Sequence, residues 1–548
     1  MKFMKESEAI KEKIKELGFI NRYQNYEFES LDMLLLQCPG WRIETPPLSL
    51  GVLASYGKSK GFKVLGLDLN VEMYRKKIDE YKDVWNIEVS SWFWNSKYHV
   101  RSYVDAHMFY LKSFFELIDL IKPKSVGFSI YNSSFDFSLS LSEKIKEVSP
   151  STKIIFGDPH VSYSLAGKYT LEISKCIDVV VESEGEYTLG EVLKAVSKGE
   201  ELTGINGTFY KVGEEIVVEK SHEPIRELDD LHYTDFSNYI FENYTKPERL
   251  PLISSRGCPN KCIYCTEMVF WKTDRSFSAE RVFKEIEYQF SKHNQITYVD
   301  FQDSLINGNL RHLERFADLV IESGMKFKWA SQAVIRREMD YKFFLKLKKS
   351  GCHCLAFGME TTSLDLMSLA GKNLARMTDL DKFVRESSEA GLHNAYNFMF
   401  VLPRETEEHH IETLEFIKRN ANYYIGAVNR SPAFCGFSNG TAGGDNPEDY
   451  GMIRDESRNN YWVSEDGTNI YLVRLRRFEE FCALVNELGI NTTYPSPMLL
   501  NREKALGDYY NFQGDYTQAL GYLKMWLKKN PSDKQSKEKL MNCLAHIA

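Results

Sequence analysis

The sequence predicts an α/β protein with an amino-terminal doubly wound, Rossmann-like domain, then a partial (β/α) barrel, and a small α-rich carboxyl-terminal region. Two observations support this prediction. Short apolar runs alternate with helical stretches from residue 31, and a second alternating series starts after Pro251. Continuous apolar strands separated by helices are typical of parallel sheets covered on both faces. At 548 residues the chain also exceeds the size of one ordinary core, so several domains are expected.

The amino-terminal domain is expected over residues 31–225. Its strand candidates are LDMLLLQCPG, KVLGLDLN, SVGFSIYN, KIIFGDPH and CIDVVVESEGE, with a helix through SLSEKIKEV. From about residue 205 to residue 250 the chain reads as polar and irregular. We therefore expect residues 226–250 to be a linker between domains.

The barrel domain is expected over residues 251–425. Its strand candidates are PLISSRG, ITYVDFQDS, KFKWASQAV, CLAFGMETT and AYNFMFVLP, and helices such as AERVFKEIEYQF and LRHLERFADLVIESG separate them. In a parallel barrel the chemistry sits at the carboxyl ends of the strands. Functional residues are therefore expected where these strands end.

Three further segments lie outside the two sheet domains. Residues 1–30 alternate charged residues with Ile and Leu, which predicts an amphipathic helix rather than a signal peptide. Residues 426–500 are rich in Gly, Asn and aromatic residues, and fit either a wall of the substrate pocket or a plain capping subdomain. Residues 501–548 have the spacing of a tetratricopeptide helix pair, carried by Leu506, Gly507, Tyr510, Ala519 and Pro531.

Charge and hydropathy exclude two classes of partner. The chain has 69 Lys and Arg against 77 Asp and Glu, a net charge of −8, so it lacks the positive excess that a phosphate backbone requires. No apolar run approaches the roughly 18 to 20 residues of a membrane span. The sequence therefore predicts a cytoplasmic protein that has no transmembrane segment and does not bind nucleic acid.

Three cysteines lie within eight residues, Cys258, Cys262 and Cys265, directly after a strand candidate. Soft thiolates at this spacing favour zinc or an iron-sulfur cluster. A structural zinc site requires four ligands, and no fourth Cys or His is close in sequence. Three cysteines on a four-iron cluster leave one iron without a protein ligand, where a substrate can coordinate. A zinc site completed by distant residues is the alternative.

The CxxxCxxC spacing, with Tyr264 before the last cysteine, resembles the radical S-adenosylmethionine (SAM) superfamily. The resemblance implies an oxygen-sensitive, anaerobic enzyme with a 4Fe-4S cluster at these three cysteines. It also implies that SAM binds the vacant iron and is cleaved reductively to a 5'-deoxyadenosyl radical. Such an enzyme needs a low-potential electron donor, a flavodoxin or a ferredoxin.

The same resemblance extends over roughly residues 251 to 425 and implies SAM contacts. FQDS would meet the methionine amino end, Arg336 would suit the carboxylate by charge and fork geometry, and Glu360 would bond the ribose hydroxyls. NFMFVLPRET resembles a Gly-Leu-Pro-Gly-Glu-Thr strand near the adenine, although Val401 and Arg404 replace both glycines. Each polar residue could equally be a satisfied strand-end group. The implied SAM-binding residues are Tyr264, Gln302, Asp303, Ser304, Gln332, Arg336, Glu360, Leu402 and Pro403.

Cys352 and Cys354 flank His353 before the Glu360 strand. Alternate cysteines at this place fit a core strand better than a second metal site.

The amino-terminal segments CPGWRIETPPLSLGVLASYGKSKG, GFSIYNSS, FGDPHVS and ESEGEYTLGEVL together resemble the cobalamin-binding domain that precedes the radical domain in a large subfamily. A degenerate doubly wound fold without cobalamin is the alternative. The implied cobalamin-binding residues are Pro39, Gly40, Trp41, Ser129, Tyr131, Ser133, Ser134, Gly157, Pro159, His160, Glu182, Glu184, Gly185 and Glu186.

No histidine is expected beneath the cobalt. Asp158-Pro-His160 is similar to the Asp-x-His-x-x-Gly sequence of other cobalamin proteins but lies on the wrong loop. The loop after the first ligand-facing strand reads Pro39-Gly40-Trp41-Arg42 and has no imidazole. Trp41 either covers the lower face of the corrin or is a packed core tryptophan.

Together the two modules predict a cobalamin-dependent radical SAM methyltransferase that acts on an unactivated carbon of a small-molecule or lipid substrate. Cyclisation, ring contraction or oxidation without methyl transfer is the second hypothesis, as in relatives similar to the anaerobic magnesium-protoporphyrin cyclase. A non-catalytic cobalamin or redox sensor is the hypothesis of another class. The sequence identifies no catalytic acid or base, and lipid, polyketide, tetrapyrrole and peptide substrates all remain open.

Overall fold

The computed structural model describes residues 31–161, 164–372, 379–424, 428–429, 435–454, 462–491 and 501–547. The helix expected over residues 1–30 lies outside the described residues. The chain divides into two compact units, residues 1–251 and 252–548, with the boundary inside one strand. Each unit is described by itself.

The first unit is built on a seven-stranded sheet in the order β2-β1-β3-β4-β5-β6-β7. Strands β1 to β5 are parallel, and β6 and β7 join the edge in antiparallel pairs. The strands are β1 (Met33–Gln37), β2 (Val64–Asp68), β3 (Ser125–Ser129), β4 (Lys153–Gly157), β5 (Val179–Val181), β6 (Thr208–Val212) and β7 (Glu215–Val218).

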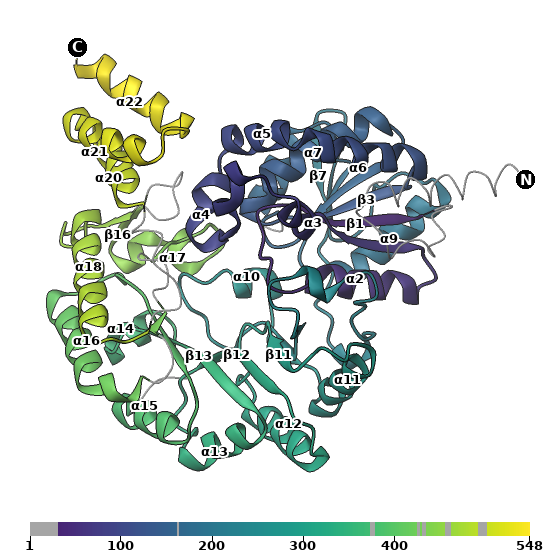
Figure 1. Cartoon of the computed structure of the whole chain (residues 1–548). Helices are drawn as coiled ribbons and strands as arrows, with labels where there is room; N and C mark the ends of the chain where they lie inside the picture. Colours follow the sequence, from purple (N-terminus) through teal and green to yellow (C-terminus); the bar gives the residue numbers. More distant parts are fainter. Residues whose placement is uncertain are drawn as a thin grey trace, which may run out of the picture. The chain divides into compact units, whose positions relative to one another are not determined.

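Helices cover both faces of this sheet (Figure 1). α2 packs with α9 on one face, and α5 and α6 pack with α7 on the other. Strands β1 to β5 are almost entirely buried because their side chains meet helices on both sides. The doubly wound, Rossmann-like fold predicted from the alternating apolar runs is therefore confirmed. The helices are α2 (Leu48–Ser59), α3 (Leu69–Arg75), α4 (Ile87–Trp94), α5 (Lys97–Ala106), α6 (Met108–Ile121), α7 (Phe135–Val148), α8 (Ser164–Ile173) and α9 (Gly185–Lys198).

One part of the expected irregular stretch is regular. Residues 208–218 form the β6–β7 hairpin, so the expectation of irregular chain from residue 205 is wrong there. The β-branched and aromatic residues of TFYKV and EIVV favour strands, and Gly213 at φ 64° provides the left-handed turn between them. After the hairpin only the 3-10 turns η4 (Leu228–Asp230) and η5 (Phe241–Asn243) interrupt the chain before β8.

A helical segment between β2 and β3 extends the core of the first unit. It comprises α3, the 3-10 turn η2 (Asp79–Trp85), α4, α5 and α6. Tyr81, Trp85, Trp94 and Tyr103 are buried there, with edge-on or tilted ring contacts between centroids 5.0–6.1 Å apart. This aromatic packing joins the segment to the sheet core.

The second unit contains a six-stranded sheet in the order β15-β14-β13-β12-β11-β8, in which β11 to β15 run parallel. A partial (β/α) barrel was predicted from the second alternating series, and this prediction is confirmed. The strands are β8 (Arg249–Leu252), β11 (Tyr298–Phe301), β12 (Lys328–Val334), β13 (Cys352–Glu360), β14 (Ala395–Phe398) and β15 (Val428–Asn429). The two-stranded sheets are β9 (Ser255–Arg256) with β10 (Arg275–Ser276), and β16 (Met452–Arg454) with β17 (Trp462–Ser464).

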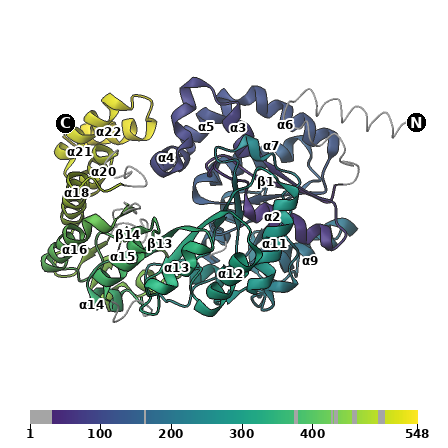
Figure 2. The same ribbon diagram turned by 60° about the horizontal axis from the view of Figure 1, so that its bottom comes forward.

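Successive helices pack side by side along the outside of this sheet, α11 on α12, α12 on α13, and α13 on α15 (Figures 1 and 2). Most begin at a side chain that accepts a hydrogen bond from the backbone of the first turn, which defines where each helix starts. These caps are Ser278, Asn309, Asp340, Ser363, Asp379 and Thr406. The helices are α10 (Glu267–Trp271), α11 (Ala279–Lys292), α12 (Leu310–Ser323), α13 (Tyr341–Lys349), α14 (Leu364–Leu369), α15 (Leu380–Glu389) and α16 (Glu407–Asn420), which the 3-10 turn η7 (Ala421–Tyr423) follows.

The carboxyl-terminal part is helical. It contains α17 (Ala442–Asp445), the 3-10 turn η8 (Pro447–Tyr450), α18 (Tyr471–Glu487), α20 (Arg502–Phe512), α21 (Tyr516–Lys529) and α22 (Lys534–Ile547). The expected tetratricopeptide-like pair corresponds to α20 and α21, where Gly507 leaves room for Leu523. A third helix, α22, packs on α21, so the segment is a three-helix array rather than a pair.

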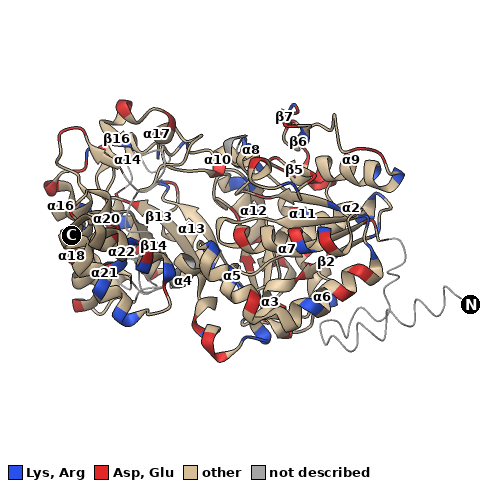
Figure 3. Cartoon of the chain, turned by 90° about the horizontal axis from the view of Figure 1, so that it is seen from above, with Lys and Arg blue, Asp and Glu red and all other residues tan. Residues whose placement is uncertain are grey.

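Figure 3 shows acidic and basic residues interspersed along the helices, consistent with the small net charge. Among the described residues, the helices are all too short or too polar to cross a membrane.

Candidate functional site

The three clustered cysteines lie on one loop of the second unit, between β9 and α10. The Cys265 amide donates to the Cys262 carbonyl at 3.0 Å, which closes a turn. All three thiols are half-buried, and burial raises the pKa of Cys258 to about 11 and that of Cys265 to about 12. Their charges also act on one another, so the three thiols lie within electrostatic range on this loop; that they hold a metal cluster stays a prediction.

Two segments from elsewhere in the unit hold this loop. The Ile263 amide donates to the Ala370 carbonyl at 3.2 Å, and the Ile263 carbonyl accepts from the Gly443 amide at 2.8 Å. Gly371, at φ 79°, lies so close that a Cβ would overlap the Lys261 carbonyl oxygen. Only glycine allows both this left-handed conformation and this close approach.

Glu360 ends β13 beside the loop and has a left-handed backbone, φ 60°. Such a conformation is costly for a residue with a side chain and is often found at functional sites. Its Oε1 lies 2.7 Å from Nζ of Lys372, a residue that sequence reasoning missed. Burial opposes the charged form of Lys372, but the Glu360 carboxylate and the Cys262 thiol raise its pKa above the usual value.

Asp303 fastens the strand that leads into the loop. Its Oδ1 accepts from the Ser254 amide at 2.9 Å, the Ser254 hydroxyl at 3.0 Å and the Ser255 hydroxyl at 2.6 Å. Its Oδ2 has no hydrogen-bond partner among the described residues. Burial raises the pKa of Asp303 to about 6. Of its neighbours, Gln302 is exposed and Ser304 bonds to Glu267.

Gln332 and Arg336 lie in or just after β12. Gln332 is exposed. The Arg336 guanidinium donates to the carbonyls of Asn307 at 3.1 Å and Gly308 at 2.9 Å, and to Glu338 at 3.0 Å. These bonds use Nη1 and Nη2, so the role of Arg336 toward a substrate carboxylate stays a prediction.

The segment after β14 carries buried Leu402 and Pro403. Arg404, which stands where the resembling strand has glycine, has φ 61° and therefore keeps the glycine-like backbone. Its Nη2 donates to the Asp449 carbonyl at 3.0 Å. The substitution thus preserves the left-handed turn while adding a side-chain contact.

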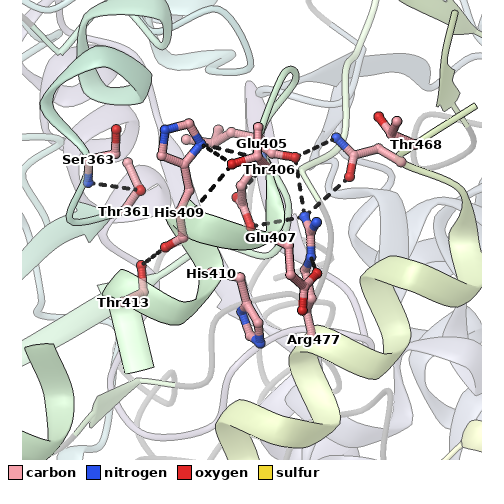
Figure 4. A network of polar contacts seen from close by, with 12 residues as sticks. Thr361, Ser363, Glu405, Thr406, Glu407, His409, His410, Thr413, Thr468 and Arg477 are labelled. Carbon is pink, nitrogen blue, oxygen red and sulfur yellow. Dashed lines mark hydrogen bonds and ion pairs between the residues drawn. The ribbon is translucent and has the colours of Figure 1, made fainter. Parts of the chain in front are cut away.

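A polar network holds the same segment (Figure 4). The Leu402 amide donates to Glu405 Oε2 at 3.0 Å, and the Glu405 carbonyl accepts from Asn469 at 3.0 Å and from Arg477 at 3.3 Å. Arg477 of α18 also reaches Glu407 at 3.2 Å. Burial raises the pKa of Glu405 to about 7. α18 thereby connects the carboxyl-terminal region to the candidate site.

Two other groups of cysteines have different surroundings. Cys435, which the sequence analysis did not single out, is fully buried in an apolar cluster with Ile263 and Leu402. No motif marks it, because only the fold brings it beside the loop. Cys352 is buried within β13, and the ring of His353 stacks on that of His393 with centroids 5.1 Å apart.

In the first unit, the candidate residues gather at the carboxyl ends of β1 and β3. The strand order 2-1-3-4-5 places its reversal between these two strands, where open α/β sheets bind ligands. Trp41 and Tyr131 stack there, with centroids 3.5 Å apart and ring planes at 13°. The Ser133 hydroxyl donates to the Gly40 carbonyl at 2.5 Å. Pro39, before them, is buried.

A second group lies after β4. The Ser129 hydroxyl bonds to Asp158, and Ser49 lies 3.3 Å from Ser129. Asp158 has φ 87°, and burial raises its pKa to about 6. Burial lowers the pKa of His160, whose ring meets the edge of Phe135. Gly157 and Pro159 flank Asp158 and complete this loop.

The remaining candidate cobalamin-binding residues lie in two other places of the first unit. Ser134 is fully buried and its hydroxyl bonds the backbone of Tyr131, so it closes its own turn. Glu182 bonds to Ser221. Glu184 and Glu186 are buried around Gly185, at the start of α9. Whether these side chains face a nucleotide tail stays a prediction.

Known proteins resemble this chain in sequence and in fold. Residues 252–417 match the family model "Radical SAM superfamily". The chain is 27% identical over 308 residues to an uncharacterized methyltransferase of Pyrococcus horikoshii, covering 56% of this chain and 66% of that protein. It is 25% identical over 300 residues to the anaerobic magnesium-protoporphyrin IX monomethyl ester cyclase of Cereibacter sphaeroides, covering 53% of this chain and 47% of the cyclase. The chain thus spans about half to two thirds of the length of these curated relatives.

Two solved structures share the fold. The cobalamin-dependent S-adenosylmethionine radical enzyme OxsB aligns with a TM-score of 0.61 and 16% identity, covering 95% of this chain and 76% of OxsB. The radical S-adenosylmethionine methyltransferase TsrM of Kitasatospora setae aligns with a TM-score of 0.59 and 16% identity, covering 82% of this chain and 91% of TsrM. The matched region contains the three-cysteine loop and the strands from β9 to β14, and this region belongs to the radical SAM superfamily.

Proposed function

We propose that this chain is a cobalamin-dependent radical SAM enzyme that cleaves SAM reductively and methylates an unactivated carbon of a small-molecule or lipid substrate. The observation that carries the proposal is the loop of three thiols beside the strained end of β13. Superfamily membership implies a 4Fe-4S cluster and SAM. That the chain binds cobalamin, that it transfers a methyl group and that its substrate is a small molecule or lipid are all parts of the proposal.

The residues fit a cluster. Cys258, Cys262 and Cys265 are half-buried thiols on one loop, and the buried ammonium of Lys372 lies within their electrostatic range. A zinc ion gathers all its ligands on one point, whereas a 4Fe-4S cluster distributes thiolates over separate irons. Among the described residues, no three His, Cys, Asp or Glu side chains are arranged to hold a single metal ion.

When bound, the cluster supplies the electron that splits SAM, and cobalamin supplies the methyl group. The protein's own residues would bind and orient. Glu360 offers a carboxylate to the ribose hydroxyls, and Asp303 Oδ2 is a buried acceptor for the methionine ammonium. The segment from Leu402 to Glu405 forms a fixed wall that excludes water.

The first unit offers a site of the right kind for a corrin. The candidate residues lie at the reversal of strand order, and small side chains there allow backbone to approach closely. A Cβ on Gly40 would overlap the Ser133 carbonyl, and Gly40 has φ 99°. The loop that follows β1 has no histidine, so the cobalt would lack a protein imidazole.

A second candidate function is radical cyclisation or oxidation without methyl transfer. It is supported by similarity to three anaerobic magnesium-protoporphyrin IX monomethyl ester cyclases, at 22% to 25% identity. Methylation is preferred because the relative with the higher identity and coverage carries a methyltransferase name.

Product analysis tests the proposal. The protein is reconstituted with iron and sulfide without oxygen, reduced with dithionite or with flavodoxin or ferredoxin, and given SAM. We expect 5'-deoxyadenosine from the wild type and from Cys352→Ala, the matched control with a buried strand cysteine, and none from Cys258→Ala. A non-catalytic sensor would release none from any protein, which would contradict the proposal. When the true substrate is present, S-adenosylhomocysteine should also accumulate; its absence favours the cyclase hypothesis.

A further inference from the structure

Lys372 is a buried cation beside the cysteine loop that the proposed function does not yet use. Its side chain is 8% exposed and that of Glu360 is 11% exposed, so their ion pair is shielded from solvent. Nζ also donates to the Gly358 carbonyl at 2.8 Å, which gives the ammonium a second fixed partner. The ammonium of Lys372 is therefore held by two groups of β13, the Glu360 carboxylate and the Gly358 carbonyl.

The strand is shaped to admit this ammonium. A Cβ at residue 358 would lie 2.6 Å from Nζ of Lys372 and 2.7 Å from Oε1 of Glu360. Any larger residue than glycine would displace the ion pair. The glycine in the LAFGMETT strand thus has a specific steric role.

The backbone of the same turn is attached to the cysteine loop. Gly371 packs against the Lys261 carbonyl, and the Ala370 carbonyl accepts from the Ile263 amide. Ala370 and Gly371 therefore clamp the loop with their backbone, and the next residue, Lys372, reaches Glu360 with its side chain. A shift of the turn would move the loop and the carboxylate together.

We propose that Lys372 is a positioning residue that fixes the Glu360 carboxylate for SAM and supplies a permanent positive charge beside the cluster loop. This inference rests on the proposed function. The ion pair uses Oε1 of Glu360, and no hydrogen bond from the described residues reaches Oε2. Oε2 is thus the oxygen offered to a ribose hydroxyl.

The charge has a separate consequence for the cluster. A reduced cluster is more negative than an oxidised one, and the potential depends on nearby charge. A cation held by the strand stabilises the reduced state and so raises the reduction potential. Removal of this cation is expected to lower that potential.

The test compares Lys372→Met with Lys372→Arg, which keeps the charge, and with Lys504→Met. Lys504 forms a similarly buried ion pair with Asp533 at 2.9 Å, but its partners Asp533, Ser536 and Trp526 all belong to the carboxyl-terminal helices or the turn between them. It controls for the general loss of a buried ion pair. Iron content and absorbance first establish whether each protein assembles its cluster.

Two quantities are then measured by electron paramagnetic resonance (EPR): the midpoint potential of the cluster without SAM, and the SAM concentration that half-saturates the change in the spectrum. For Lys372→Met we expect a midpoint potential lower by at least about 59 mV, which is a tenfold rise in the ratio of oxidised to reduced cluster at a given potential. We also expect at least tenfold weaker SAM binding. Lys372→Arg should have a midpoint potential and a SAM affinity close to those of the wild type. Lys504→Met should match the wild type in both quantities.

Equal potentials and SAM responses in Lys372→Met and the wild type would overturn the inference, as would equal changes in Lys504→Met. If Lys372→Met assembles no cluster, Lys372→Gln, which keeps a hydrogen-bond donor without the charge, takes its place with the same expected potential shift. A wild type that assembles no iron cluster would instead refute the proposed function, so the two failures are distinguishable.

Discussion

Replacement of Asp303 by Asn tests the interpretation of its buried carboxylate. All three hydrogen bonds reach Oδ1, and an amide oxygen can accept the same three. Burial raises the pKa of Asp303 from 3.8 to about 6. The change therefore removes a poorly solvated charge and leaves the hydrogen bonds from Ser254 and Ser255 in place.

The direction in which stability changes with pH follows from proton binding to Asp303. Because the folded pKa lies above the unfolded one, the folded state binds more protons between pH 3.8 and about 6, and stability falls as pH rises through this window. About two pKa units at 1.36 kcal/mol each amount to about 3 kcal/mol lost above pH 7. The amide of the Asp303→Asn variant does not titrate and has no such loss. The Nδ2 donor of the variant takes the place of Oδ2, which has no partner among the described residues, and an unpaired buried donor costs about 1–3 kcal/mol at every pH. We therefore expect the stability of the variant relative to the wild type to rise by about 3 kcal/mol from below pH 4 to pH 8, with about half of that rise reached at pH 5.

The assay is thermal unfolding of the cluster-free proteins at pH 8 and pH 5, without oxygen. Between pH 5 and pH 8 the expected rise is about 1.5 kcal/mol, which for a unit of this size shifts the midpoint of the variant relative to the wild type by roughly 3 °C. Ser254→Ala is the matched control, because it removes one hydrogen bond to the carboxylate and should lower the midpoint instead. A difference between the midpoints of Asp303→Asn and the wild type that is the same at both pH values would refute the assignment of Asp303 as a desolvated carboxylate.

The remaining predictions concern backbone space and ring packing. Gly371→Ala should abolish or strongly reduce iron incorporation because its Cβ would overlap the Lys261 carbonyl, whereas Gly324→Ala, with φ 71° and nothing within 4 Å, should lose only about 1 kcal/mol of stability and keep its iron. Iron analysis and unfolding of both variants check this, and equal iron in both would contradict the clamp. Trp41→Leu and Tyr131→Leu in a double-mutant cycle should show a coupling of about 1 kcal/mol in cobalamin-free protein, since the two rings stack on each other. Urea unfolding measures it, and a coupling near zero would show that the rings are apart in solution.

Most of the architecture could be predicted from local patterns. Apolar strand runs and intervening amphipathic helices are properties of adjacent residues, so both sheets were visible in the alternation. The β6–β7 hairpin was missed because polar residues such as Glu214 and Glu215 hide its alternation at an exposed sheet edge. The third helix, α22, was missed because the tetratricopeptide pattern describes only two helices.

The site was predictable only in part. The spacing of Cys258, Cys262 and Cys265 is a local signal, and all three thiols lie on the one loop between β9 and α10. Lys372 carries no such signal, since its pairing with Glu360 depends on how the chain returns through α14 to the end of β13. The same holds for Asp303, whose sequence position suggested a ligand contact but whose Oδ1 is taken by Ser254 and Ser255.

The central claim is that three thiols of one loop hold a 4Fe-4S cluster. Metal analysis of protein purified and reconstituted without oxygen tests it most directly, with a Cys258→Ala, Cys262→Ala, Cys265→Ala triple variant as the comparison. We expect about four irons per wild-type chain, no stoichiometric zinc, and no bound iron in the variant. Stoichiometric zinc without iron in the wild type, or equal iron in both proteins, would contradict the account.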